Sequence, residues 1–204
     1  MSFDLDTGSE GSSGPFINWH ANGRQDGTAD SKTFSLKEGD NRSDITAKFQ
    51  KGVILDIDNM KTGWNSFALS RWEWNDNVSR WASKPTDGDD WKKGVSIQIA
   101  LGGGDVGTWI QSGSGTWEAI KCLAPQLKDG QRGQLPMVKM TGVGNLVFTV
   151  GGTKYAELEV IKWVDRPDSF DEVEPKFHAA TQRGDDALKA AVTPAPAAQP
   201  NEEF

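Results

Sequence analysis

The stretch GVILDIDNMKTGWNSFALSRWEW, residues 52–74, decides the fold class, because it predicts two neighbouring β-strands. Aliphatic side chains at every second position of residues 53–58 predict a strand with one face in a core. The turn signal KTG at 61–63 follows, and residues 64–74 then predict a second strand. We expect these two strands to pair as a hairpin.

The second predicted strand carries three tryptophans. Side chains alternate between the two faces of a strand, so one face is expected to carry Trp64, Trp72 and Trp74. Phe67 and Leu69 are expected on the other face. Small residues separate the three indoles, which would leave rings that can stack on nucleic acid bases. Tryptophan also packs in cores, and a bulge or twist could turn any of these rings inward, so both interpretations stay open.

Residues 75–94 form a long polar segment that nevertheless contains Trp81 and Trp91. Basic side chains surround the two indoles in the sequence, among them Lys92 and Lys93. Aromatic rings interleaved with cations are what a channel for single-stranded nucleic acid requires, because the rings stack on bases and the cations follow the phosphates. The alternative is that both rings fold back over the core.

The rest of the chain predicts further strands and one short helix. Strong alternation at 95–101 predicts the clearest strand, and the glycine run GGGDVG follows it at 102–107. This run matches GxGxxG formally, but residues 108–111 resemble a strand rather than the helix of a dinucleotide site, so we expect a hairpin turn. Thr116 is expected to begin the helix, which would bury Cys122. Other strands are expected at 31–36, 135–141, 146–150 and 155–163, with a loop at 39–44 and a two-residue Gly-Gly turn at 151–152.

Length and composition favour one β-rich domain with an appendage. The chain has 204 residues, and its nine Trp and 23 Gly are typical of a turn-rich protein with many aromatic surfaces. A single Cys excludes an internal disulfide framework. No stretch approaches the roughly 18 apolar residues that span a membrane, and the first residues lack a signal-peptide pattern. We therefore expect a cytoplasmic protein.

An enzyme is the weaker functional class. His20 and His178 are the two histidines, and neither lies in a metal-ligand or catalytic-triad motif. Asp56 and Asp58 share a strand face and could in principle pair as catalytic carboxylates, but acids on such a strand more often face solvent. The sequence therefore predicts no enzyme activity, no cofactor and no metal.

The charge is unevenly distributed along the chain. The formal net charge is −7, and the residues from Asp165 onward contain nine acidic and four basic side chains. That segment carries −5, which leaves −2 for residues 1–164, so the body can still present a basic face to nucleic acid. We expect a flexible leader at 1–14, a folded domain at 15–167 and a disordered acidic tail at 168–204.

Strands, one short helix and then closing strands are compatible with an all-β, OB-fold-like Greek-key barrel. Three segments and the acidic ending carry a more specific likeness: KTGW at 61–64, LPMVKMTGV at 135–143 and YAELEVIKWVDRP at 155–167. On these residues the chain resembles the single-stranded DNA-binding proteins of bacteriophages and prophages. The resemblance implies an OB-fold body, an acidic C-terminal tail, and sequence-independent binding of single-stranded DNA in phage DNA replication, recombination or repair.

The expected DNA-binding site combines aromatic platforms with basic phosphate partners. The expected stacking residues are Trp64, Trp72, Trp74, Trp81 and Trp91. The expected phosphate partners are Lys61, Arg71, Lys92 and Lys93.

Two roles are expected of the acidic tail. A tethered polyanion can compete with DNA for a basic groove. Glu202, Glu203 and Phe204 can recruit a replication or recombination protein, although the ending lacks the penultimate Pro of bacterial single-stranded DNA-binding proteins. The sequence leaves a homodimer open. The alternative function is a phage structural or carbohydrate-binding β-sandwich, which would explain the Trp and Gly content but not the tail.

Overall fold

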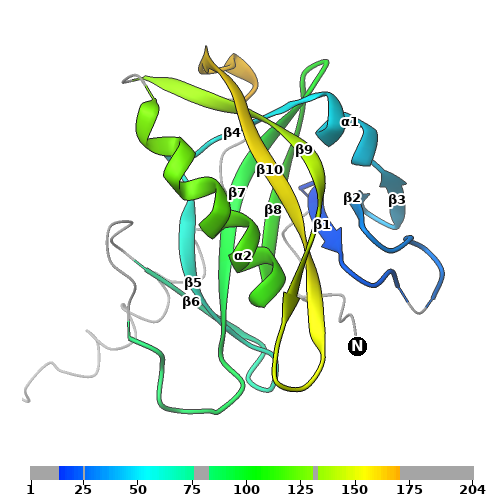
Figure 1. Ribbon diagram of the computed structural model, residues 1–204, viewed down its shortest axis with the longest axis vertical. Helices are drawn as coiled ribbons and strands as arrows, with labels where there is room; N and C mark the ends of the chain where they lie inside the picture. The colour runs from blue at the N-terminus through cyan, green and yellow to red at the C-terminus, as the bar shows by residue number, and fades with distance from the viewer. Residues whose placement is uncertain (1–13, 25, 76–82, 131–132, 171–204) are drawn as a thin grey trace, which may run out of the picture. The chain divides into compact units, whose positions relative to one another are not determined.

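The computed structural model describes residues 14–24, 26–75, 83–130 and 133–170 (Figure 1). Within them, ten strands form one curled, half-barrel sheet, which confirms the predicted all-β, OB-fold-like class. The strands are β1 (Phe16–His20), β2 (Thr33–Glu38), β3 (Asn41–Asp44), β4 (Val53–Leu55), β5 (Lys61–Ser66), β6 (Arg71–Trp74), β7 (Lys92–Gly102), β8 (Asp105–Ser112), β9 (Gln134–Val147) and β10 (Gly152–Asp165). The helices are α1 (Thr46–Lys51), α2 (Ser114–Leu123) and the 3-10 helices η1 (Ala124–Asp129) and η2 (Asp168–Phe170).

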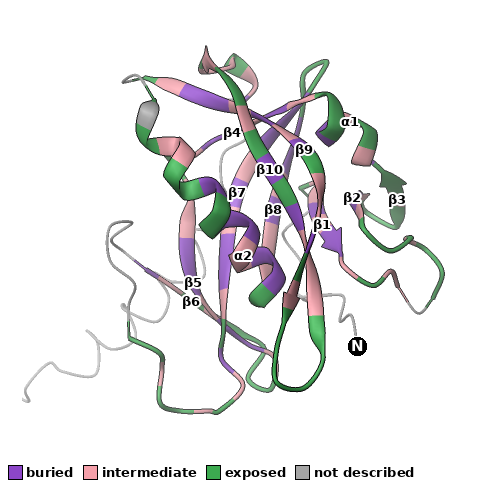
Figure 2. Cartoon of the chain, in the orientation of Figure 1, coloured by how far each residue is buried: buried purple, intermediate pink, exposed green. Residues whose placement is uncertain are grey.

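The core lies against one face of β7 and β8. The alternation at 95–101 is confirmed, because Val95, Ile97 and Ile99 are fully or almost fully buried. Trp109 of β8 is buried among them and meets the ring of Phe34 edge-on. Figure 2 shows buried positions along β7 and exposed positions at the turn between β9 and β10. Apolar side chains of α2 cover this face, which explains why the predicted helix forms there.

The glycine run after β7 is a hairpin turn, as predicted. β7 and β8 pair antiparallel from Gly94 opposite Ser112 to Gly102 opposite Asp105. Gly103 and Gly104 both have positive φ values of 71° and 91°, which other residues rarely adopt. The GxGxxG match therefore reflects turn geometry.

The two strands predicted on either side of Gly142 and Gly144 are one strand, β9. Its antiparallel partner β10 begins at Gly152, so the connection is the four residues 148–151 and the predicted two-residue Gly-Gly turn is wrong. Phe148 N donates to Gly151 O at 3.1 Å and closes this turn. Gly144 lies inside this strand, opposite Tyr155. A glycine is needed at this position because the ring of Tyr155 occupies the space that a side chain would fill.

Two smaller predictions are also wrong, and one short helix was not predicted. The segment 39–44, expected as a loop, contains β3, which pairs with β2. The six-residue helix α1 was not predicted, although it buries Phe49 against the parallel ring of Phe34 at a centroid distance of 3.7 Å. Cys122 is exposed on α2 rather than buried, because the core side of that helix carries Ile120 and Leu123.

Side-chain hydrogen bonds cover the outer edge of β10. Trp19 Nε1 donates to Lys154 O at 3.1 Å. Gln126 of η1 accepts from Val160 N at 2.9 Å and donates to Leu158 O at 3.3 Å. An edge strand whose backbone groups are occupied in this way is protected from pairing with another chain.

The folded body continues past the predicted boundary at residue 167. Arg166 donates through both terminal nitrogens to the two carboxylate oxygens of Asp56, each at 2.8 Å. Asp56 is fully buried, so the expectation that it faces solvent is wrong. Phe170 of η2 is 3% exposed and packs with Ala100 and Val106 on the face of the sheet opposite the main core. Residues 1–13 of the predicted leader and residues 171–204 of the predicted tail lie outside the described residues.

Candidate nucleic-acid interface

The tryptophan-rich stretch is a hairpin, not one strand. β5 and β6 pair antiparallel through a turn at residues 67–70, with Ser66 opposite Arg71. Ser70 N donates to Phe67 O at 3.1 Å, and Ser70 has a positive φ of 48°. β4 does not pair with β5, because it lies between β7 and β9. Both the single-strand prediction and the predicted hairpin between β4 and the tryptophan strand are therefore wrong.

The turn changes which tryptophans share a face. Residues directly opposite each other in antiparallel strands point to the same face. Trp72 is opposite Asn65 and Trp74 is opposite Gly63, whereas Trp64 is opposite Glu73. Trp72 and Trp74 therefore share one face of the sheet, and Trp64 lies on the other.

The face that carries Trp72 and Trp74 is called the outer face here, because the opposite face carries the core. The register between β5 and β7 settles this assignment: Thr62 is opposite the buried Val95, and Trp64 is opposite Lys93. Thr62 and Trp64 therefore lie on the core side. Both residues of the Trp72–Trp74 pair are half-buried.

Trp72 and Trp74 stack on each other. Their ring centroids are 4.6 Å apart and their planes differ by 8°. Gly94 and Gly63 leave the space for these rings: a Cβ atom on Gly94 would lie 2.5 Å from Trp72, and one on Gly63 would lie 3.0 Å from Trp74. Since each ring covers one face of its neighbour, each has at most one face left for another planar group.

A lysine lies on either side of the tryptophan pair. Along the outer face, Lys92 is opposite Asn65, the residue paired with Trp72. Lys61 precedes Gly63, the residue paired with Trp74, by two positions and therefore lies on the same face. The four residues Trp72, Trp74, Lys61 and Lys92 are called the outer-face platform below.

Trp64 and Lys93 lie together on the core side, at the end of the sheet. Lys93 Nζ is 5.8 Å from the ring centroid of Trp64 and 5.2 Å from that of Trp117 on α2. Both rings are half-buried. Nothing in the sequence indicates that Trp117 meets Lys93.

Trp91 and Asp87, which precede β7 in the chain, contact Arg71 of the β5–β6 hairpin. Trp91 is 5% exposed, so its ring is not available to a base and the prediction that Trp91 stacks on DNA is wrong. The Arg71 guanidinium lies 5.0 Å from the Trp91 ring centroid and forms ion pairs with Asp87 at 2.6 Å and Glu73 at 3.0 Å. Arg71 is thus engaged by two carboxylates, which makes it a poor phosphate partner. Trp81 lies outside the described residues, as do Glu202, Glu203 and Phe204.

The carboxylates of Asp87 and Asp90 join the segment before β7 to the β5–β6 hairpin. The pKa of Asp87 is lowered from its usual 3.8, and the largest cause is the hydrogen bond from Arg71. Asp90 accepts from Ser66 Oγ at 2.6 Å and from Ala68 N at 2.9 Å, and these bonds lower the pKa of Asp90 below 3.8 as well. A hydrogen bond or positive charge that favours the ionised carboxylate has this effect.

These shifts predict acid-dependent loosening of the β5–β6 turn. A carboxylate whose pKa is depressed in the folded state stabilises the fold above its unfolded pKa, and that contribution is lost as the pH falls through the folded value. We therefore expect the Ala68 amide, followed by NMR, to titrate with a midpoint below pH 3.8. Ser66→Ala should move the midpoint up, because the largest cause of the shift is removed. A midpoint at or above 3.8 in the unaltered protein would contradict the assigned hydrogen bonds.

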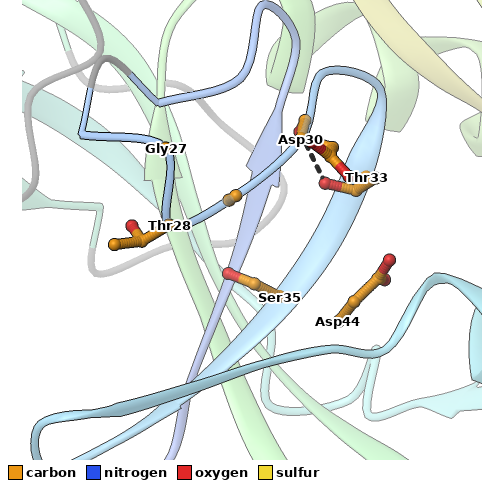
Figure 3. Close-up of a pocket in the computed structure, with 7 residues that line it drawn as sticks. Gly27, Thr28, Asp30, Thr33, Ser35 and Asp44 are labelled. Atoms are coloured by element: carbon orange, nitrogen blue, oxygen red, sulfur yellow. Dashed lines mark hydrogen bonds between the residues drawn. The ribbon is translucent and has the colours of Figure 1, made fainter.

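A separate pocket of about 120 Å³ lies over β2 and β3 (Figure 3). Ser35 and Asp44 help to line it, and Thr33 Oγ1 donates to Asp30 O at 2.7 Å at its rim. Beneath it, Ser35 Oγ lies 2.7 Å from His20 Nε2 and accepts from Arg42 at 2.8 Å. In the sheet, β8 and β1 separate β2 from β7, so this pocket is not part of the platform.

Comparison of the chain with family models, with curated proteins and with solved structures found no match. Among the described residues, no helix is long and apolar enough to cross a membrane. The candidate interface therefore rests on the geometry of the chain itself.

Proposed function

We propose that the protein binds single-stranded DNA without sequence preference and acts in phage DNA replication, recombination or repair. The observation that carries the proposal is the stacked pair of Trp72 and Trp74, which lies between Lys61 and Lys92 on the outer face of an OB-fold-like sheet. Faces of OB-fold sheets commonly bind oligonucleotides.

The platform suits two bases with their phosphates. One base stacks on the remaining face of Trp72 and one on that of Trp74, and Lys92 and Lys61 lie toward these two ends. Every base has a π-face, so stacking tolerates any sequence and contributes about 1–3 kcal/mol for each base. A duplex keeps its base faces within its own stack and cannot use the platform in this way.

The lysines of the platform are tested by the salt dependence of binding. For single-stranded nucleic acid, the logarithm of the affinity falls by about 0.7 for each tenfold rise in salt and each phosphate neutralised. We expect Lys61→Ala and Lys92→Ala each to reduce this slope by about 0.7, measured by titration with a labelled oligonucleotide at several salt concentrations.

Lys139→Ala is the matched control, because Lys139 lies on β9 and pairs with Glu159 at 3.4 Å, away from the platform. Its slope should stay unchanged. If binding were independent of salt in the unaltered protein, the phosphate assignment would be wrong. Indole rings also stack on sugars, so salt-independent binding of a carbohydrate in place of DNA would favour the β-sandwich alternative.

The proposal gives the acidic residues after the folded body two roles, competition with DNA and recruitment of a replication or recombination protein. Burial of Phe170 determines how this is tested: a chain shortened to Phe170 keeps the packed end of the body, whereas one shortened to Pro167 would uncover Ala100 and Val106. We expect the chain that ends at Phe170 to bind DNA more tightly, most clearly at low salt, where charges act over longer distances. Unchanged DNA affinity would exclude competition, and Phe204→Ala with undiminished partner recovery would exclude recruitment through that residue.

A further inference from the structure

We propose that bound single-stranded DNA continues from the outer-face platform across the β6 edge of the sheet to Trp64, Lys93 and Trp117, so that Trp117 of α2 is a further DNA-binding residue. This inference rests on the proposed function. The three residues are called the edge cluster below. They come from β5, β7 and α2, and they meet on the core side of the sheet.

The beginning of α2 is fixed close to Lys93. Gly113 N donates to Lys93 O at 2.9 Å, and Trp117 N in turn donates to Gly113 O at 3.0 Å. This pair of bonds joins the first turn of α2 to β7 at the position where β7 meets Trp64 of β5. The close fit of α2 against β10, where a Cβ on Gly115 would lie 2.6 Å from Lys154 O, fixes the helix from its other side. Trp117 is therefore held beside Lys93 by backbone contacts on both flanks.

The edge cluster differs from a core aromatic cluster in two respects. Trp109 and Trp19 in the core are 0% and 4% exposed, whereas Trp64 and Trp117 are only half-buried. The group between the two edge-cluster rings is an ammonium, not an aliphatic side chain. Two partly exposed indoles with a cation between them offer stacking for bases and a charge for a phosphate, which is the combination that single-stranded DNA recognises.

The platform and the edge cluster are adjacent through the backbone. Lys92 and Lys93 are consecutive and point to opposite faces of β7, and Trp64 lies between Gly63 and Asn65, the partners of the stacked pair. Among the described residues, β6 pairs with β5 alone, so its other side is an edge of the sheet. A flexible strand can pass around such an edge from one face to the other.

Two acidic side chains that the structure describes near this route, Glu73 and Glu118, are already paired. Glu73 lies opposite Trp64 on the same face and forms an ion pair with Arg71 at 3.0 Å. Glu118, the residue after Trp117, forms an ion pair with Lys121 at 2.6 Å. These pairs reduce the repulsion that the two carboxylates would exert on a phosphate backbone.

The test compares oligonucleotides of graded length. An oligothymidylate of two or three nucleotides fills only the platform, whereas a longer one, of about 8–12 nucleotides, lies within the range that one OB-fold covers and reaches both sites. We expect Trp117→Ala to bind the short ligand like the unaltered protein and to bind the longer ligand at least about fivefold more weakly. Trp163→Ala is the matched control, because Trp163 is also half-buried but lies on β10 against Gly130.

Lys93→Met provides a second measurement in case Trp117→Ala does not fold. Methionine keeps an apolar stem between the rings and removes the charge, so the salt slope should fall by about 0.7 for the longer ligand only. Trp117→Phe should restore part of the lost affinity because it restores a ring. If Trp117→Ala and Lys93→Met bind the longer ligand like the unaltered protein while loss of Trp72 and Trp74 weakens binding, the inference is wrong and the proposed function stands. If the unaltered protein binds neither ligand, both are wrong.

Discussion

Replacing Trp72 and Trp74 together with alanine is expected to remove most of the affinity for single-stranded DNA and to leave the protein folded. Each base that loses its stacking partner should cost about 1–3 kcal/mol of binding free energy. The two rings lie on the outer face, away from the buried Trp109 and Phe34, so the core stays intact. Fluorescence anisotropy with a labelled oligonucleotide measures the loss, and thermal unfolding of the same variant shows whether the fold survives.

Two controls separate ring contact from general damage. Trp109→Ala removes a fully buried ring and should cost about 3–5 kcal/mol of stability without a specific effect on binding by the folded fraction. Gly94→Ala keeps both rings of the pair but places a methyl group 2.5 Å from Trp72, which must move. That variant should weaken binding although no aromatic side chain is lost. Unchanged DNA affinity in the double alanine variant would show that the pair is not the platform.

Arg166→Met is expected to destabilise the folded body by about 3–5 kcal/mol, because it leaves the buried carboxylate of Asp56 without its charged partner. Asp56 is 0% exposed, and both of its oxygens accept from Arg166 at 2.8 Å. Asn59 Nδ2 also donates to Asp56 at 2.9 Å, but one amide bond does not replace a bidentate ion pair. Chemical denaturation of the variant measures the change in the free energy of unfolding.

The double variant Asp56→Asn with Arg166→Met is the matched control for this ion pair. It removes the buried charge together with its partner, so it should be clearly more stable than Arg166→Met alone. Equal stability of the single and double variants would mean that the buried charge is not what makes Arg166 necessary.

Patterns within one strand allowed much of the sheet to be predicted from the sequence. The alternation at 95–101 and the glycine run after it correctly predicted β7 and the turn into β8, because a half-buried strand repeats every two residues. The register of the tryptophans could not be predicted in this way. The turn FALS at 67–70 contains no Gly, Pro, Asn or Asp, and Ser70 is its one turn-favouring residue, so the reversal of the chain gives only a weak sequence signal. Ser70 adopts a positive φ there.

Contacts between distant parts of the chain account for the remaining features of the structure that the sequence did not predict. Arg166 and Asp56 are 110 residues apart, and only their pairing explains a fully buried acid at the end of β4. Lys93 meets Trp117 because the start of α2 is hydrogen-bonded to β7, which helical periodicity alone does not indicate. Gly63 was interpreted from the sequence as part of a turn and Gly94 as the end of a polar segment, whereas both lie in strands, and their importance emerges once Trp74 and Trp72 are placed over them.

Equilibrium titration of the intact protein with single-stranded DNA, and with a duplex of the same sequence, tests the central claim most directly. Intrinsic tryptophan fluorescence reports base stacking, and two salt concentrations separate stacking from phosphate contacts. We predict strong quenching by the single strand, tighter binding of the single strand than of the duplex, and a large loss of affinity for the single strand in the variant that lacks Trp72 and Trp74. Equal affinity for both forms, or undiminished affinity for the single strand without these two rings, would contradict the account.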